Sequence, residues 1–253
     1  MRHLKILAAA FALSAGMTAV AAAPKPPTIA AAVAAGDRSP DNVKMDAGRK
    51  PAQVLQFLGL RPGMNVLDLF GGNAYWAEMM APVVGPKGHD TVWEPAQFFG
   101  DKTKASFAAF AAKHPNVSIV VSPLQAPELP KNYADLVILN DNYHDLYADF
   151  SKHGIPRIEP RQWLKALYAA VKPGGVVGVI DHVGNPGDTR ATASSVHRID
   201  PNTLKADFES AGFVLAGTSD LLRNKTDDHT LLVFNPKVAG MTDRAIFKFR
   251  KPR

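Results

Sequence analysis

The sequence contains no cysteine among its 253 residues. This absence excludes disulfide frameworks, thiolate nucleophiles, cysteine-bound zinc and iron–sulfur clusters. A strong charge of one sign is also absent: the formal net charge is +6, and the basic residues are scattered along the chain. The charge pattern therefore predicts no nucleic-acid partner. What remains, 46% apolar and 21% charged side chains, is typical of a globular protein that buries a sizeable core.

Residues 1–22 have the pattern of a secretory signal peptide. Arg2 and Lys5 carry positive charge, residues 6–20 carry none, and three alanines follow before a proline-rich stretch. We expect cleavage after Ala22 and a periplasmic location. Because the apolar run approaches the length of a bilayer span, an uncleaved anchor is the alternative. No second run of that length follows, so we expect no membrane span after cleavage.

Beyond the leader, strand-like and helix-like segments alternate, which is typical of βαβ units and a mostly parallel sheet covered on both faces. Strands are predicted at residues 65–70, 91–93, 117–121, 134–140, 176–180, 214–222 and 245–249, with 231–234 as a further candidate at the sheet edge. Helices are predicted at residues 28–35, 51–58, 75–83, 96–113 and 160–171, and within 198–211. Residues 184–198 are predicted to form a polar loop that covers the substrate. We expect a linker and helical appendage over residues 23–60 and one α/β domain over residues 61–253.

Four strand ends carry residues suited to ligand binding, because the ligands of open parallel sheets bind beyond the carboxyl ends of the strands. Gly71-Gly72 follow the first strand, where the missing Cβ atoms allow a ligand to approach the backbone. Glu94 ends the second strand, where a carboxylate can bind both ribose hydroxyls. The other two ends carry the polar clusters Asn140–Asp145 and Asp181-His182. The pattern favours an adenosine-type ligand over a purely structural turn.

Motifs of several other enzyme classes are missing from the sequence. The spacing G-x-G-x-x-G does not occur, which disfavours a dinucleotide cofactor such as NAD. No P-loop lysine follows the glycines, and no G-x-S-x-G nucleophile elbow is present. An NAD-dependent oxidoreductase is therefore disfavoured.

Several segments together resemble class I S-adenosylmethionine-dependent methyltransferases. They are Val66-Leu67-Asp68 before the glycines, Glu94, and the Leu-Tyr-Ala-Ala-Val-Lys-Pro-Gly-Gly sequence before the fifth strand. Residues 142–145, residues 197–200 and the terminal Thr-Asp-Arg…Lys-Phe-Arg-Lys-Pro are similar to a narrower group, the predicted secreted or periplasmic methyltransferases of proteobacteria. The resemblance covers residues 38–253. It implies a Rossmann-like fold with a seven-stranded, mostly parallel sheet in the order 3-2-1-4-5-7-6, strand 7 antiparallel, and helices on both faces.

The resemblance also implies a cofactor, S-adenosylmethionine, and the residues that bind it. The implied set is Asp68, Phe70, Gly71, Gly72, Asn73, Glu94, Leu124 and Asn140. The glycine loop would pass under the methionine part of the cofactor, Glu94 would bind ribose, Leu124 would lie near the adenine, and Asn140 would face the methionine end. The chain departs from the usual loop at Phe70 and Ala74, where the family has glycine. The bulky Phe70 either shifts the cofactor or indicates a weak or lost site.

Methyl transfer is an in-line displacement in which the protein aligns the reactants and removes a proton from a hydroxyl or amine acceptor. His144 is the predicted base, because it follows the fourth strand and an unperturbed imidazole pKa of about 6.5 suits neutral pH. Asp145 or Asp141 would orient its ring, and Tyr143 would stack on the substrate or form the pocket wall. His182 is a second candidate acid or base. The alternative is that Tyr143 and His144 cap the next helix and pack.

Basic side chains are predicted to contact an anionic small-molecule substrate. Arg190 and Arg198 lie in the predicted polar loop together with His197, and Arg49 lies in the appendage. Ordinary surface ion pairs explain these residues equally well.

Two classes of function follow from these patterns. The first is a methyltransferase that acts on a small molecule or a component of the cell envelope. The second is a non-catalytic periplasmic ligand-binding protein on a degenerate methyltransferase fold, which Phe70 and Ala74 favour. A divalent metal held by Asp141, Asp181 and His182 is a further alternative, because carboxylates and an imidazole at adjoining strand ends can bind such an ion. We adopt the enzyme without a metal as the prediction.

Overall fold

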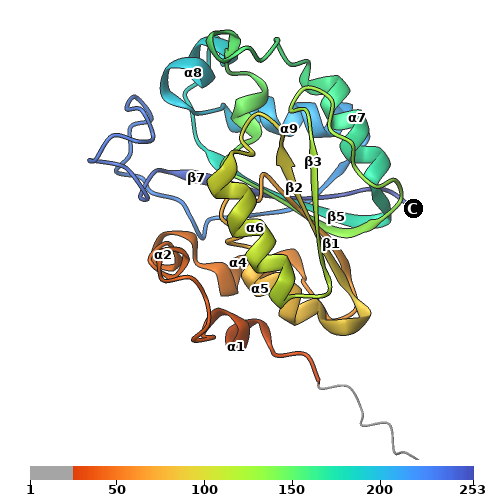
Figure 1. Cartoon of the computed structure of the whole chain (residues 1–253). Helices are drawn as coiled ribbons and strands as arrows, with labels where there is room; N and C mark the ends of the chain where they lie inside the picture. The colour runs from red at the N-terminus through yellow and green to blue at the C-terminus, as the bar shows by residue number, and fades with distance from the viewer. Residues whose placement is uncertain (1–24) are drawn as a thin grey trace, which may run out of the picture.

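The computed structural model of the protein describes residues 25–253, so the predicted signal peptide lies outside the described residues. The described chain is built on a seven-stranded sheet in the order β3-β2-β1-β4-β5-β7-β6, in which β7 runs antiparallel to its neighbours (Figure 1). The strands are β1 (Asn65–Leu69), β2 (His89–Pro95), β3 (Val117–Ser122), β4 (Ala134–Asn140), β5 (Val171–His182), β6 (Val214–Ser219) and β7 (Arg244–Arg250). The predicted α/β fold and its strand order are confirmed.

Helices cover both faces of the sheet (Figure 1). They are α1 (Ile29–Val33), α2 (Pro40–Val43), α3 (Asp46–Arg49), α4 (Pro51–Leu58), α5 (Ala77–Val84), α6 (Asp101–Lys113), α7 (Pro160–Ala170), α8 (Thr189–Val196) and α9 (Pro201–Ser210). Three short 3-10 helices are η1 (Gly85–Lys87), η2 (Tyr143–Leu146) and η3 (Ser151–His153). Helices α1, α4 and α5 pack on one face of the sheet, whereas α7 and α9 pack on the other.

Each face of the sheet has its own hydrophobic core, because successive side chains of a strand point to opposite faces. Leu67 and Leu69 of β1 pack in one core with Trp163 of α7 and Phe208 of α9. Val66, the residue before Leu67, points to the opposite face and packs in the other core with residues of α4 and α5. Because both faces are covered, the central strands are nearly continuous apolar runs in the sequence.

The helical appendage before β1 packs on the rest of the chain. Arg38 is almost fully buried between Asp46, with Nη1 2.6 Å from Oδ2, and Glu78 of α5, with Nε 3.5 Å from Oε2. Asn42 donates from Nδ2 to the Asn73 carbonyl oxygen at 3.2 Å. The appendage therefore borders the loop that follows β1, where the ligand is predicted to bind.

Several element bounds differ from the sequence-based prediction. Strand β5 begins at Val171, because residues 172–175 form an irregularity within the β4–β5 pairing and do not end it. The predicted loop 184–198 contains α8, whose N-cap Asp188 accepts hydrogen bonds from two backbone N–H groups. Helix α6 begins at Asp101 and β6 ends at Ser219, both inside their predicted ranges, and residues 231–234 are not part of a strand.

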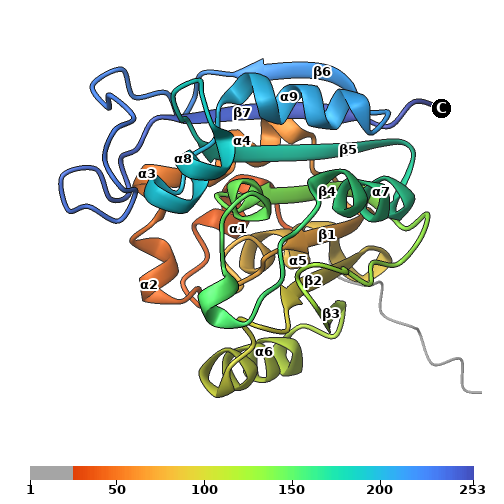
Figure 2. The same cartoon turned by 90° about the horizontal axis from the view of Figure 1, so that it is seen from above.

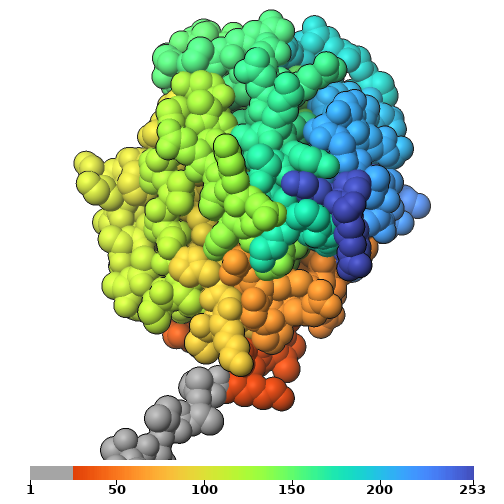
Figure 3. Space-filling view, turned by 90° about the vertical axis from the view of Figure 1, so that its right-hand side faces the viewer, coloured from red at the N-terminus to blue at the C-terminus, as the bar shows by residue number. Residues whose placement is uncertain are grey.

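The segment between β6 and β7, residues 220–243, lies with α2, α3 and α8 at one end of the sheet (Figure 2). We refer to it as the β6–β7 segment. Residues 251–253, dark blue in Figure 3, lie on the surface beside the end of α7. Lys251 Nζ donates there to the carbonyl oxygens of Tyr168 and Val171 at 2.8 Å each. Within residues 25–253, the helices lack the combined length and apolar character needed to cross a bilayer.

Candidate functional site

Two glycines with different tasks form the loop after β1. Gly71 donates its N–H to the Trp93 carbonyl oxygen at 3.2 Å, and a Cβ at this position would lie 2.0 Å from Val92 Cγ1. Gly71 is therefore needed for close packing of the loop against β2. Gly72 has a φ of +53° and donates its N–H to Glu94 Oε2 at 2.9 Å. This bond joins the ends of β1 and β2, the two strand ends where a nucleoside is predicted to bind.

Phe70 and Ala74 occupy left-handed backbone conformations, with φ of 56° and 59°. Glycine adopts this region freely, whereas an L-residue pays about 1–2 kcal/mol. The requirement for positive φ explains why glycine is usual at both positions of such a loop. In this chain a phenylalanine and an alanine adopt that conformation.

The ring of Phe70 packs against the core next to the loop. Its centroid lies 5.1 Å from the Trp93 ring, edge-on, and 6.2 Å from the Trp163 ring, stacked. Both tryptophans are buried. The Phe70 ring therefore packs on two buried tryptophans beside the loop.

A cleft of about 220 Å³ lies at this loop. From the predicted cofactor set, the residues that line it are Phe70, Gly71, Gly72, Asn73, Glu94 and Asn140. Glu94 is only 4% exposed, and burial raises the pKa of its carboxyl although the Gly72 N–H partly offsets this. A buried carboxylate beside an open glycine backbone is suited to a ligand that carries a ribose.

Asp68 and Leu124, also in the predicted cofactor set, do not border the cleft. Asp68 is buried within the sheet, where burial and the charge of Glu94 raise the pKa of its carboxyl to about 8. Leu124 is fully buried in the core that contains α7, and its N–H donates to Gln97 Oε1 at 2.9 Å. Both side chains are buried, and neither lines the cleft.

Asn140, the last residue of β4, lies at the boundary between the cleft and a larger cavity. Its Nδ2 donates to Asp141 Oδ2 at 3.0 Å. Its Oδ1 is buried and accepts no hydrogen bond from the part of the chain that the structure describes. A buried acceptor without a donor costs free energy that a ligand can recover. Asn140 is therefore suited to a ligand N–H group, such as the ammonium of an amino-acid moiety.

The larger cavity has a volume of about 600 Å³ and adjoins the cleft. The residues that border both spaces are Arg49, Phe98, Asn140 and Asn142. From the predicted catalytic set, the cavity is lined by His144, Asp145 and His182. Its walls come from the appendage, the segments after β4 and β5, and the β6–β7 segment. Two adjoining spaces of this kind are suited to a cofactor and a second small molecule.

Carboxylates surround the His144 imidazole. Its Nδ1 lies 2.7 Å from Asp181 Oδ1, its backbone N–H donates to Asp181 Oδ2 at 2.8 Å, and its Nε2 lies 3.3 Å from Asp145 Oδ1. Burial alone would lower the pKa of His144, but Asp181, Asp145 and Asp141 outweigh it and raise the pKa to about 9. The carboxylates around this ring therefore favour its protonated form. Without a cation among these carboxylates, the imidazole holds a second proton and has no lone pair with which to act as a general base.

His182 lies on the other side of Asp141. Its Nε2 is 3.9 Å from Asp141 Oδ1, and its Nδ1 is 2.7 Å from Thr242 Oγ1. Burial lowers the pKa of His182, so this imidazole is neutral at pH 7. Arg49 and Arg244 approach Asp141 Oδ2 at 4.0 and 3.6 Å. The structure thus brings the predicted substrate ligand Arg49 to the cavity.

Tyr143 and Arg190, both predicted at the site, point away from the cavity. Tyr143 is fully buried, donates its hydroxyl to Asp207 Oδ2 at 2.8 Å and packs on the Phe208 ring at 5.2 Å. Arg190 donates from Nη2 to the Ile158 carbonyl oxygen at 2.9 Å. Neither side chain lines the cleft or the cavity. The packing alternative therefore describes Tyr143, and Arg190 ties α8 to the chain before α7.

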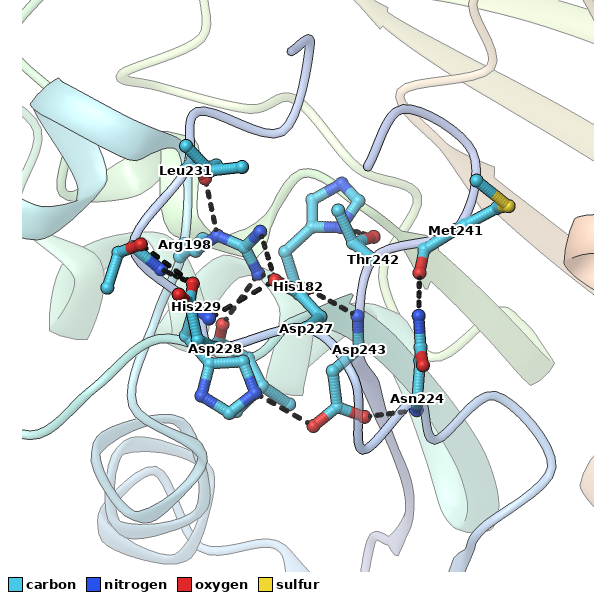
Figure 4. Close-up of polar contacts among 12 residues, drawn as sticks. His182, Arg198, Asn224, Asp227, Asp228, His229, Leu231, Met241, Thr242 and Asp243 are labelled. Carbon is cyan, nitrogen blue, oxygen red and sulfur yellow. Dashed lines mark hydrogen bonds and ion pairs between the residues drawn. The ribbon is translucent and has the colours of Figure 1, made fainter. Parts of the chain in front are cut away.

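Arg198, predicted to bind the substrate, is fully buried against the β6–β7 segment (Figure 4). It forms a bidentate ion pair with Asp227, with Nη1–Oδ2 at 2.9 Å and Nη2–Oδ1 at 3.1 Å. It also donates to the carbonyl oxygens of Val183 at 3.0 Å and Leu231 at 2.9 Å. These contacts correct the prediction, because the occupied guanidinium holds the β6–β7 segment against the end of β5.

The alternative metal set of Asp141, Asp181 and His182 is not assembled. Asp181 uses its two carboxylate oxygens on the ring and the backbone N–H of His144. In residues 25–253, the side chains whose ligand atoms converge within 4.8 Å are a different group: His144, Asp145 and His197.

Sequence reasoning missed Thr242 and Arg244 as cavity residues. Both belong to the polar triplet Thr242-Asp243-Arg244, whose last member is the first residue of β7. Because β7 is antiparallel, its first residue lies beside the end of β5, and Arg244 pairs in register with His182. The signal was therefore present: a polar triplet at the start of an antiparallel strand lies at the same edge as the ends of the parallel strands.

Comparison with known proteins supports this description at the level of the fold. No model of a known protein family matches the chain. The demethylmenaquinone methyltransferase of Listeria monocytogenes serotype 4a is 28% identical over 130 residues, which are 51% of this chain and 49% of that protein. That of Listeria welshimeri is 28% identical over 129 residues, with the same coverage. The chain spans about half the length of the curated relatives it matches.

Solved structures match a larger part of the chain. A SAM-dependent methyltransferase from Aquifex aeolicus has a TM-score of 0.56 and 18% identity, and the match covers 83% of this chain and 99% of that one. The 1,6-didemethyltoxoflavin-N1-methyltransferase of Burkholderia thailandensis, with S-adenosylhomocysteine bound, has a TM-score of 0.52 and 17% identity over 84% of this chain and 80% of that one. These likenesses, with the strand order, define the fold as that of class I S-adenosylmethionine-dependent methyltransferases.

Proposed function

We propose that this protein is an S-adenosylmethionine-dependent methyltransferase that acts on a small molecule or a component of the cell envelope. The observation that carries the proposal is the junction of the cleft and the cavity at Asn140. Glu94 and the glycine loop lie on one side of this junction, and the larger cavity lies on the other. The bound S-adenosylhomocysteine in a structure of the same fold supports this choice of cofactor.

The residues of the cleft fit the parts of this cofactor. The Glu94 carboxylate is suited to accept hydrogen bonds from two ribose hydroxyls, and the unpartnered Asn140 Oδ1 is suited to accept one from the ammonium group. When bound, S-adenosylmethionine supplies an electrophilic methyl group. The protein's own task is then to hold the acceptor in line with that group and to exclude water.

The cavity combines charged and apolar walls. Arg49 and Arg244 present positive charge near Asp141, whereas Phe98 and Phe234 present aromatic rings. A volume of about 600 Å³ lies within the range of small-molecule sites. We therefore propose an acceptor with an apolar body and an oxygen-bearing polar group. The names of the curated relatives, demethylmenaquinone methyltransferases, support a small-molecule acceptor.

Calorimetric titration with S-adenosylhomocysteine tests the cofactor site. We expect the wild type to bind it and Glu94→Gln to bind about 10- to 100-fold more weakly, because hydrogen bonds to a charged group contribute about 1.5–3 kcal/mol. Glu209→Gln, a half-exposed substitution on α9, is the matched control and should bind as the wild type does. A wild type that does not bind, or a Glu94→Gln variant that binds equally well, refutes the proposal. Binding of an unrelated small ligand instead would favour the non-catalytic alternative.

Turnover is tested with S-adenosylmethionine labelled in its methyl group and an envelope or small-molecule extract. His144 lines the cavity but not the cleft, so His144→Ala should lower the yield of labelled product and leave the affinity for S-adenosylhomocysteine nearly unchanged. An unaltered rate would remove His144 from the mechanism.

We also propose that the protein is exported to the periplasm through cleavage of residues 1–22. The support is the charge and hydropathy pattern of the leader. N-terminal sequencing of the protein from the periplasmic fraction should begin at Ala23. Recovery of chains that begin at Met1 from the cytoplasmic fraction alone would contradict this location.

A further inference from the structure

Three potential ligand side chains converge on one wall of the cavity. His144 and Asp145 come from η2, directly after β4, and His197 is the C-cap of α8. The His144 Nε2 lies 3.3 Å from both His197 Nδ1 and Asp145 Oδ1, and the last two atoms lie 3.6 Å apart. The three atoms therefore form a nearly equilateral triangle.

The size of this triangle matches the coordination sphere of a small divalent ion. The point in its plane equidistant from the three atoms lies about 2.0 Å from each, and zinc–nitrogen and zinc–oxygen bonds are about 2.0–2.2 Å long. Ligand atoms at such distances lie about 3.4 Å apart in a tetrahedral site and about 3.0 Å apart in an octahedral one. The observed separations of 3.3–3.6 Å therefore fit a tetrahedral ion slightly out of the plane.

Hydrogen bonds behind the triangle orient two of its members. Asp181 Oδ1 lies 2.7 Å from His144 Nδ1, which directs Nε2 toward the triangle. Asn142 donates from Nδ2 to Asp145 Oδ2 at 3.0 Å, which leaves Oδ1 facing the triangle. A carboxylate behind a histidine ligand is the usual outer contact of metal-binding imidazoles, because it fixes the tautomer and the ring orientation.

The backbone places His197 at this position at a cost. Its φ of +54° lies in the left-handed region, which an L-residue occupies at about 1–2 kcal/mol. Its N–H still donates to the Ala193 carbonyl oxygen at the end of α8, and its ring packs near Phe234 at 5.3 Å. This conformation turns His197 toward the cavity while the next residue, Arg198, enters the core.

We propose that His144 Nε2, Asp145 Oδ1 and His197 Nδ1 bind one divalent transition-metal ion of the zinc class. Two imidazoles with a single carboxylate favour zinc, cobalt or iron over magnesium and calcium, which prefer oxygen ligands. All three side chains line the cavity, so a fourth position is open to water or to an oxygen of the acceptor. Only this last statement about the acceptor rests on the proposed methyl transfer.

Hydrogen bonding without a metal is the competing explanation of the triangle. In that case protons on the two imidazoles occupy the space between the three atoms, and added metal finds no site. The two explanations therefore differ in stoichiometric metal binding, which can be measured without any substrate or cofactor.

The experiment uses the mature chain, residues 23–253, stripped with a chelator and dialysed against zinc, cobalt(II) or magnesium chloride. We expect one zinc per chain by elemental analysis, the intense visible absorption of four-coordinate cobalt(II), and no retention of magnesium. Asp181→Asn should weaken zinc binding by about 10- to 100-fold, and His197→Gln should weaken it further. His89→Gln, at the start of β2 and outside the cavity, is the matched control and should leave binding unchanged.

A wild type that retains no zinc at micromolar concentrations overturns the proposal, and so does a loss of binding as large in His89→Gln as in His197→Gln. Circular dichroism checks the fold of each variant. Should His197→Gln fail to fold, the cobalt spectrum of the wild type decides, since a spectrum without four-coordinate bands also overturns it. Calorimetry with S-adenosylhomocysteine is independent of the metal, so failure of the metal site and failure of the proposed transferase remain distinguishable.

Discussion

Removal of the Asp227 carboxylate tests how strongly the buried ion pair holds the β6–β7 segment. The Arg198 side chain is fully buried. In Asp227→Ala its guanidinium loses the carboxylate oxygens that its two Nη atoms contact at 2.9 and 3.1 Å. Loss of one partner of a buried ion pair costs about 3–5 kcal/mol, because the remaining charge is left uncompensated. Two carbonyl oxygens still accept hydrogen bonds from Arg198, so we expect the lower end of this range, about 3 kcal/mol.

Asp41→Ala is the matched control for this variant. It removes the aspartate of an ion pair of similar length, Lys44 Nζ–Asp41 Oδ1 at 2.7 Å, whose side chains are 75% and 84% exposed. Exposed pairs contribute about 0–1 kcal/mol, because water screens the charges and the side chains lose entropy on pairing. The two variants therefore remove the same chemical group and should differ several-fold in their effect.

Urea denaturation followed by tryptophan fluorescence measures the free energy of unfolding of both variants. A loss below about 1 kcal/mol in Asp227→Ala would refute the reasoning, because it would mean that another group or water compensates the guanidinium. A double variant, Arg198→Met with Asp227→Leu, removes both charges of this pair and should be more stable than Asp227→Ala alone.

Other predictions concern the loop after β1 and the buried acids beside it. Gly71→Ala should destabilise the fold by about 1–3 kcal/mol in urea denaturation, because the added Cβ would overlap the Val92 side chain of β2. Ala74→Gly should stabilise the fold by up to about 1 kcal/mol, because glycine adopts the positive φ of this position without strain. Burial raises the pKa of Glu94, so the calorimetric affinity for S-adenosylhomocysteine should fall as the pH is lowered through that raised pKa, and Glu94→Gln should abolish the pH dependence. Burial and Asp68 raise the pKa of Asp90 far above its value of about 3.9 in the unfolded chain, so folding is penalised as pH rises above that value. The melting temperature of Asp90→Asn should therefore exceed that of the wild type by more at pH 8 than at pH 5, and an equal difference at both would contradict the shift.

The strands could be located because they alternate with helices, whereas their order was implied by the resemblance to class I methyltransferases. The central strands are buried on both faces, so their apolar runs are long enough to locate them within a few residues. Helix α8 could not be predicted in the same way. It is short and largely polar, and its N-cap Asp188 indicates its start only if a helix is already expected there.

The candidate site was predicted in outline, but the direction of individual side chains was not. Tyr143 and His144 are neighbours in η2, yet one is buried against α9 and the other faces the cavity. His197 and Arg198 are likewise neighbours, and the left-handed φ of His197 sends the two side chains to opposite sides. Neither separation follows from sequence spacing, because it depends on backbone angles set by tertiary contacts. The ends of β1 and β2 were predicted more fully, since strand geometry alone brings Gly72 to Glu94.

Arg244 contacts the appendage although the two are far apart in the sequence. Its Nη2 donates to the carbonyl oxygen of Gly48, which lies 196 positions earlier. The cavity is therefore incomplete until the residues at the start of β7 have been synthesised. Because β7 lies between β5 and β6, a chain terminated before residue 244 would also expose an unpaired strand edge and be a target for aggregation or proteolysis.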